Sequence, residues 1–305
     1  MAETLISPGV LALENDNSFV SSQPITVGAA IIGPTVKGQV EIPTVVRSYS
    51  DYQNKFGTTF LSASQVYTYF TSIAAFNYFN NGGQTLLVTR VVSGNFAPAT
   101  TATASVVGAS GGGVTILNSA SLAQALVLTT LSEGGVMNSS SSLDISGSLA
   151  SGSADNIRWQ ITNPDSSAGT FNLLIRQGDD NANTPIILES WTNLSMDPTA
   201  PNYVARLIGD QYKAYDSADN QIVVNGTYPN NSRYVYVASV NTPTPLYFDN
   251  NGQAKPAFTG SLPKAASGSF TGAEGSLATG VNAKYYDAII FRSSKYSRFN
   301  RFRLY

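Results

Sequence analysis

Acidic residues beside amides are the first candidates for chemistry in this sequence. The densest group is Asp179 and Asp180, followed by Asn181 and Asn183 in the stretch RQGDDNANTP. Carboxylate and amide oxygens at this spacing could form a weak calcium loop, but the EF-hand glycine at position six and glutamate at position twelve are absent. We favour a polar hairpin tip. The acidic residues in ENDNS and FDNNG are interpreted as turns.

The residue types that the sequence lacks exclude several kinds of active site. The 305 residues contain no histidine and no cysteine. Catalytic triads, cysteine–histidine pairs, histidine zinc sites and disulfides are therefore excluded within them. No two carboxylates stand out as an acid–base couple. We expect a protein that is not an enzyme, with no catalytic or metal site and no cofactor.

Adjacent glycines, Gly82 and Gly83, raise the question of a phosphate loop. Such loops run from a strand through the glycines into a helix, whose N-terminus attracts the anion. Here the order is reversed, because residues 62–77 are predicted to be a helix and residues 86–92 a buried strand. The glycines follow a helix C-terminus, whose partial negative charge repels phosphate. A structural turn is therefore the preferred interpretation.

The helix expected over residues 62–77 rests on two signals. Ser62 and Gln65 have the spacing of a capping box. Apolar residues recur on one helical face, at Val66, Phe70, Ile73 and Ala74.

Composition favours a weakly charged, β-rich chain. Hydrophobic residues make up 42% and charged residues 12%, about half the usual charged fraction. This suits a subunit covered by copies of itself, although an ordinary β-rich domain has the same composition. The net charge of −2 gives no drive towards nucleic acid or acidic membranes. No apolar run reaches the roughly 18 residues of a membrane span, so we expect no membrane or nucleic-acid partner.

Six segments follow from changes in composition. They are an N-terminal arm (1–25), an α/β unit (26–95), a Ser/Thr/Gly-rich linker with short strands (96–153), a β-rich domain (154–257), a Gly/Ser-rich segment (258–290) and a basic, aromatic tail (291–305). The expected fold class is α+β and β-rich: an N-terminal α/β unit with an inserted, mainly β domain.

Within the α/β unit, strands are expected at 25–32 and 40–46, with Pro43 indicating an edge or a bulge. A short helix over 51–56 is expected to stop at Gly57.

Within the β-rich domain, strands are expected at 157–163, 170–176 and 185–191, with turns at 163–165 and 178–179. A helix is expected at 203–209. Two further strands are expected in 220–240, separated by Asn225 and Gly226.

The C-terminal tail differs from the rest of the chain. Five basic residues alternate with aromatic ones at Arg292, Lys295, Arg298, Arg301 and Arg303. Such a pattern could bind nucleic acid or another anionic surface. Because the change in composition is abrupt, we favour a short tail without a selected function, such as the product of an altered reading frame.

Several stretches in this order resemble the contractile tail sheath protein of myovirus-type bacteriophages, particularly the T4-like and cyanophage branch. They are SPGVLALE (7–14), VGAAIIGPTVKGQVEIPTVVRSYSDYQNKFG (27–57) and FNYFNNGGQTLLVTRV (76–91). Residues 153–211 resemble the insertion domain of that branch, which implies a position on the outer surface. The residues that carry the motifs are Pro8, Gly9, Gly33, Pro34, Asp51, Phe56, Gly57, Gly82, Gly83 and Arg90.

The resemblance implies a structural subunit of the virion. Copies would polymerise as a helical tube around the tail tube and contract to drive genome delivery. The implied partners are the chain itself, the tail tube protein, and the baseplate and tail terminator proteins, with assembly in the host cytoplasm. Val10, Leu11, Ala12 and Leu13 would form an arm donated to a neighbouring subunit, which deletion of residues 1–20 would test.

One departure from the family keeps two alternatives open. Sheath proteins are usually longer, and the sequence ends near the start of their C-terminal domain, which contacts the tail tube. The alternatives are a truncated or split sheath fragment, and a baseplate or decoration protein that reuses sheath domains. A third hypothesis is that the protein binds nucleic acid or another anion through the 291–305 tail.

Overall fold

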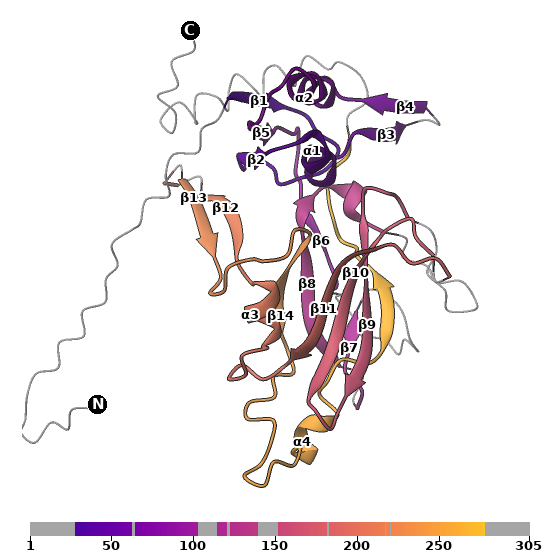
Figure 1. Ribbon diagram of the computed structural model, residues 1–305, viewed down its shortest axis with the longest axis vertical. Coiled ribbons are helices and arrows are strands. Elements are labelled where there is room, and N and C mark those ends of the chain that lie inside the picture. The colour runs from indigo at the N-terminus through magenta and orange to yellow at the C-terminus, as the bar shows by residue number, and fades with distance from the viewer. Residues whose placement is uncertain are drawn as a thin grey trace, which may run out of the picture.

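The computed structural model describes residues 28–62, 65–102, 115–120, 123–139, 152–181, 183–216, 218–219 and 221–277. The expected arm with Val10, Leu11, Ala12 and Leu13, the motif residues Pro8 and Gly9, the turn in ENDNS and the basic tail all lie outside these residues. The described part confirms the predicted fold class, α+β and β-rich. Figure 1 shows an α/β unit at one end and a larger β structure below it.

The α/β unit is built around a three-stranded sheet. Its elements are β1 (Ala29–Gly33), β2 (Thr44–Val46), α1 (Tyr49–Phe56), β3 (Thr59–Ser62), β4 (Gln65–Thr68), α2 (Phe70–Asn80) and β5 (Leu86–Arg90). The sheet has the order β1-β5-β2, with β1 parallel and β2 antiparallel to β5. The core of the unit consists of Val46, Tyr52, Phe56, Ala75, Leu86 and Val88.

Helix α1 begins and ends at residues that the sequence indicates. The side-chain oxygen of Ser48 accepts a hydrogen bond from the N–H of Asp51 at 3.0 Å, which caps the first turn. Gly57 ends the helix with a φ of 69°, and its N–H donates to the carbonyl of Gln53. The predicted stop at Gly57 is confirmed.

The predicted helix over residues 62–77 is wrong in its first half. Ser62 and Gln65 pair across a β3–β4 hairpin and form no capping box. The ring of Phe60 stacks on those of Tyr67 and Tyr69, at centroid distances of 5.8 Å and 4.8 Å. These aromatic contacts stabilise the hairpin, and the helix α2 begins only after it.

The orientation of α2 is set by close packing on β1. A Cβ atom on Gly33 would lie 2.5 Å from the Thr71 hydroxyl oxygen. The buried side of the helix therefore consists of Thr71, Ser72 and Ala75. The predicted apolar face, which includes Phe70 and Ile73, is turned to solvent.

The larger β structure consists of two packed sheets and a separate two-stranded sheet formed by β12 and β13. One has the order β14-β8-β6, with β7 also paired to β8, and the other has the order β11-β10-β9-β15. The elements are β6 (Pro98–Thr100), β7 (Ile116–Leu117), β8 (Gln124–Glu133), η1 (Gly135–Met137), β9 (Ile157–Asp165), β10 (Thr170–Gln177), β11 (Ile187–Ser195), α3 (Val204–Ile208), β12 (Tyr212–Asp216), β13 (Gln221–Asn225), β14 (Val235–Val240), α4 (Pro256–Thr259) and β15 (Ala266–Ser269).

The core of this β structure lies between its sheets. Trp159 on β9 and Phe171 on β10 are fully buried there together with Leu126 and Leu128 on β8. The indole N–H of Trp159 donates to the carbonyl of Ser269, which joins β9 to β15. Apolar residues on alternating positions of both sheets thus close a single core.

Strand β8 contradicts the expectation of short strands in residues 96–153. It extends over ten residues, and the central residues 125–130 are buried. Strands β6 and β14 flank it, so its burial depends on segments distant in sequence.

Most strands of the β-rich domain are confirmed. The turn expected at 163–165 is wrong, because these residues end β9 and the turn follows at 166–169. Asp165 sets that turn by accepting from the N–H groups of Ser167 and Ala168. The helix expected at 203–209 is confirmed as α3. The described residues contain no helix long and apolar enough to span a membrane.

Candidate functional site

Arg90 is the centre of a joint between the α/β unit and the β structure. It is the last residue of β5, and its side chain is fully buried. One guanidinium nitrogen donates to the carbonyls of Gly38 at 2.8 Å and Glu133 at 2.7 Å, and the other to the carbonyl of Val36 at 3.4 Å. A buried guanidinium requires such acceptors. Arg90 thus links the 34–40 loop to the end of β8.

Further contacts hold Arg90 in place. The Phe96 ring centroid lies 5.0 Å from the guanidinium carbon, which permits a cation–π interaction. The backbone N–H of Glu41 donates to the Arg90 carbonyl, and that of Val91 donates to the Gly33 carbonyl, both at 3.0 Å. Side chain and backbone of Arg90 therefore both bond to the 36–41 segment, and the side chain also bonds to Glu133.

Several predicted motif residues lie around the same loop. Gly33 is the register partner of Arg90 and starts the loop with Pro34. Phe56 is buried, and its carbonyl accepts a hydrogen bond from the N–H of Lys37 at 3.1 Å. Gly57 lies against Val36, whose Cβ atom would be 2.9 Å from a Cβ atom at the glycine. The fold thus gathers motif residues that are separated in the sequence.

Charged groups at the joint are strongly affected by burial. Glu133 accepts from the N–H of Val40 at 3.3 Å. Burial raises the pKa of Glu133, although that hydrogen bond and the Arg90 cation oppose the shift. Lys37 and Asp155 form an ion pair at 3.8 Å across the two parts. Burial lowers the pKa of Lys37 and raises that of Asp155, despite their mutual attraction.

A cavity of about 210 Å³ lies at this joint. Its walls include Lys37 and Phe56 from the α/β unit, and Met137, Asp155 and Tyr234 from the β structure. Its charged lining consists of the Lys37–Asp155 ion pair together with Lys55 and Arg233. We assign it a structural role at the joint.

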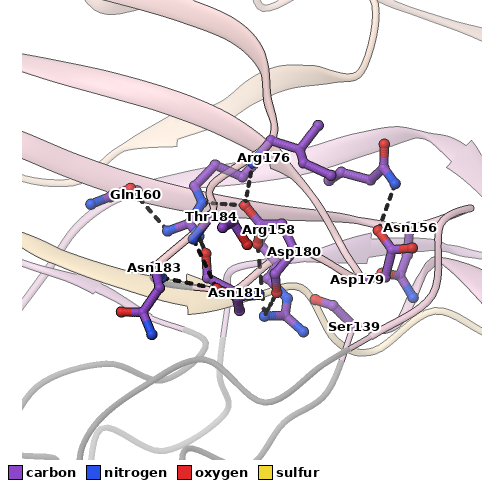
Figure 2. A network of polar contacts seen from close by, with 12 residues as sticks. Ser139, Asn156, Arg158, Gln160, Arg176, Asp179, Asp180, Asn181, Asn183 and Thr184 are labelled. Carbon is purple, nitrogen blue, oxygen red and sulfur yellow. Dashed lines mark hydrogen bonds and ion pairs between the residues drawn. The ribbon is translucent and has the colours of Figure 1, made fainter.

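A second buried polar cluster lies in the β9–β10–β11 sheet and the loop after β10 (Figure 2). Asp180 is 2% exposed, and its carboxylate accepts from Arg176 Nε at 2.6 Å and from the N–H of Ile186 at 2.9 Å. The guanidinium of Arg158 donates to the Asp180 carbonyl at 3.2 Å and lies 4.0 Å from its carboxylate. One carboxylate is therefore shared by two buried arginines.

Arg176 also binds the loop that follows Asp180. Its two terminal nitrogens donate to the Gln160 side chain at 3.0 Å and to the Asn181 carbonyl at 2.8 Å. The Asn181 side chain accepts from the N–H groups of Asn183 and Thr184. These bonds fold the loop back over the end of β10.

The interpretation of residues 179–180 as a polar hairpin tip needs a correction. Asp179 is exposed and accepts a hydrogen bond from the side-chain amide of Gln177, as a tip residue would. Asp180 instead points inward, because the arginines on β9 and β10 attract its charge. Among the described residues, no group of three or more His, Cys, Asp or Glu side chains could hold a metal ion. The Asp180 carboxylate is engaged by arginines and a backbone N–H, which argues against a calcium loop at this position. The interpretation of Asp249 as a turn residue is confirmed by its bonds to the N–H groups of residues 251 and 253.

The remaining motif residues lie away from the joint. Asp51 is in the first turn of α1 and pairs with Lys55 at 2.9 Å. Gly82, with a φ of 89°, follows α2 and confirms the predicted turn. Gly83 lies against the Tyr78 ring, where any larger residue would clash. These residues shape the α/β unit.

Sequence reasoning missed the partners of the buried arginines. Gly38, Glu133 and Phe96 carry no local signal of their contact with Arg90. A signal did exist in the arginines themselves, since LLVTRVV and IRWQI each place a cation inside an apolar stretch. Such a residue is buried and must find acceptors.

Comparisons with known proteins give limited information. No family model matches the sequence, and no curated protein matches it. Among solved structures, a sheath tail protein from Listeria innocua is 12% identical, with a TM-score of 0.37. The match covers 88% of this chain and 38% of that one. A sheath tail protein from Desulfitobacterium hafniense is 12% identical with a TM-score of 0.27, over 76% of this chain and 39% of that one. Such TM-scores do not establish a common fold.

Proposed function

We propose that this chain is a structural subunit of the contractile tail sheath of a myovirus-type bacteriophage, of the T4-like branch. Copies polymerise as a helical tube around the tail tube, and contraction of this tube drives genome delivery. The partners are further copies, the tail tube protein, and the baseplate and tail terminator proteins. The role is mechanical and involves no catalysis.

The observation that carries the proposal is the ordered set of sheath-like motifs between residues 7 and 211. The arrangement of the motif residues supports it physically. Gly33, Phe56, Gly57 and Arg90 surround the loop that joins the α/β unit to the β structure. A sheath subunit must rotate without deforming while its contacts change, and a joint made of buried hydrogen bonds suits that task.

The chain spans 38% and 39% of the length of the two solved sheath tail proteins. The activity of a whole subunit, including polymerisation, is therefore part of the proposal.

Immunogold electron microscopy of intact virions tests the proposal. The antibody is raised against residues 154–211, which are expected on the outer surface. Gold along the whole tail is the expected result. Gold confined to the baseplate or head, or no gold on the virion, would overturn the sheath assignment.

A further inference from the structure

Helix α2 turns its large apolar side chains towards solvent. Phe70 is 76% exposed, Phe76 47% and Ile73 44%. Val66 and Tyr67 on the preceding strand β4 are also 66% and 39% exposed, but as neighbours in a strand they point to opposite faces of the hairpin. In Figure 1, α2 and the β3–β4 hairpin lie together at the end of the molecule farthest from α4. We call Phe70, Ile73 and Phe76 the α2 face.

The exposure of the α2 face departs from the usual pattern. A surface helix normally buries its apolar side and shows polar residues to water. Here the fully buried residues are Thr71, Ser72 and Ala75, with Tyr78 and Phe79 half-buried against the core of the α/β unit. The Ser72 hydroxyl lies 3.2 Å from that of Tyr49 on α1, so this side already has its partners. The fold holds the apolar side outward, which indicates a contact outside the described residues.

The area of the α2 face suits a protein interface. With 150–250 Å² for a whole large side chain, the three exposed portions sum to on the order of 300 Å². Isolated patches of about 300–600 Å² are often functional. A stable interface needs about 800 Å² on each partner. The α2 face can therefore supply the apolar centre of one, with Asn77 and Asn80 at its polar rim.

The charge pattern identifies the kind of partner. From Phe56 to Thr89 the chain contains no charged residue. A charged surface docked here would lose the hydration of its charges without gaining an ion pair. A second copy offers an uncharged apolar surface of the same kind, with no like charges brought together. We propose that the α2 face is the contact surface for a second copy of this chain.

The inference rests on exposure and charge and is independent of the proposed sheath role. A chain absent from the tail could still pair through the α2 face. A chain present in the tail could assemble through other surfaces. The immunogold result and the self-association result therefore separate the two proposals.

Sedimentation equilibrium of the full chain over a wide concentration range tests the inference. Phe70→Ser/Ile73→Ser removes two exposed side chains that belong to neither core cluster. We expect the Kd of self-association to rise at least about 100-fold, as for a pair of central interface residues. The matched control is Ile187→Ser/Val224→Ser, at 51% and 54% exposure on other strands. We expect the control to associate like the unmodified chain.

A second measurement reports the α2 face directly. The chain has no cysteine, so Asn77→Cys provides a single site for an environment-sensitive fluorophore. A blue shift that grows with protein concentration supports the inference. A monomer at every concentration, or equal association of the Phe70→Ser/Ile73→Ser variant, would overturn it. The inference would also be overturned if the blue shift did not depend on concentration and disappeared on removal of residues 278–305. The α2 face would then be covered by a segment of its own chain.

Discussion

Arg90 and Arg176 are both buried arginines near the end of a strand, yet they contact different kinds of acceptor. Arg90 donates to main-chain carbonyls of Val36, Gly38 and Glu133, which come from two distant parts of the chain. Arg176 donates to the Asp180 carboxylate only four residues away. The first cluster joins two parts of the molecule, and the second orders a single loop.

The difference in acceptors changes the cost of losing one partner. Carbonyls that lose Arg90 are neutral dipoles and can be partly rehydrated. Arg176 and Arg158 would each keep a buried positive charge if Asp180 were removed. An uncompensated buried charge costs more than a lost hydrogen bond. The local cluster is therefore expected to be the more sensitive of the two, although it joins less of the chain.

The largest effect is expected for Asp180→Ala. The two buried arginines lose their shared carboxylate, and the free energy of unfolding should fall by about 3–5 kcal/mol. The only two tryptophans, Trp159 and Trp191, lie on β9 and β11 beside this cluster. Their fluorescence during denaturant unfolding measures the loss. Asp179→Ala, at the exposed neighbour, should stay within about 0.5 kcal/mol. Equal effects of the two variants would refute the different roles assigned to them.

A smaller loss is expected for Arg90→Met, which keeps the apolar stem. Loss of the hydrogen bonds to Gly38 and Glu133 should cost about 2–3 kcal/mol, because the desolvation penalty of the buried cation is removed together with its bonds and offsets part of their loss. Since these bonds join two parts, tyrosine absorbance, to which both parts contribute, should then show a second transition that is absent from the tryptophan fluorescence of the β structure. Arg47→Met, at an exposed arginine of the same unit, is the control. A single, unshifted transition in the Arg90→Met variant would contradict a joint at this residue.

The smallest effect is expected for Glu133→Gln, which should gain stability relative to the unmodified chain at neutral pH. Burial raises the pKa of Glu133 above its ordinary value of 4.5. A group whose pKa is higher in the folded than in the unfolded protein contributes to the free energy of unfolding. This contribution is fully present below the pKa of the unfolded state and is lost as pH rises through the pKa of the folded state. The unmodified chain should therefore lose stability between pH 4.5 and the raised pKa, and the glutamine variant should lose less. Unfolding midpoints from pH 4 to pH 7 measure this difference, and parallel curves would disprove it.

Local backbone requirements were the most predictable part of the fold. Gly57 and Gly82 adopt positive φ angles after helices, as their positions in the sequence indicate. The hairpin at residues 62–65 was not predictable from spacing, because Ser62 and Gln65 fit both a capping box and a cross-strand pair. The stacking of Phe60 on Tyr67 and Tyr69 decides between them.

Non-local contacts were the least predictable part. Nothing in the sequence indicates that Arg90 donates to the carbonyl of Glu133. Nor does it indicate that the carbonyl of Asp180 accepts from Arg158. Phe70 faces solvent because Thr71 packs closely against Gly33 on β1. The spacing of apolar residues along the helix cannot predict such a contact with another element. The composition of residues 96–153 likewise does not predict the long strand β8, because its burial depends on pairing with the distant strand β14.

The pairing of β8 with β14 also affects how the protein must be made. A ribosome releases β8 well before it has synthesised β14, with β9, β10 and β11 translated in between. Until β14 has been synthesised, the edge of β8 that pairs with it is unpaired. Unpaired strand edges can pair with other nascent chains. Translation speed between residues 133 and 235, and chaperone supply during this interval, should therefore determine the yield of soluble protein.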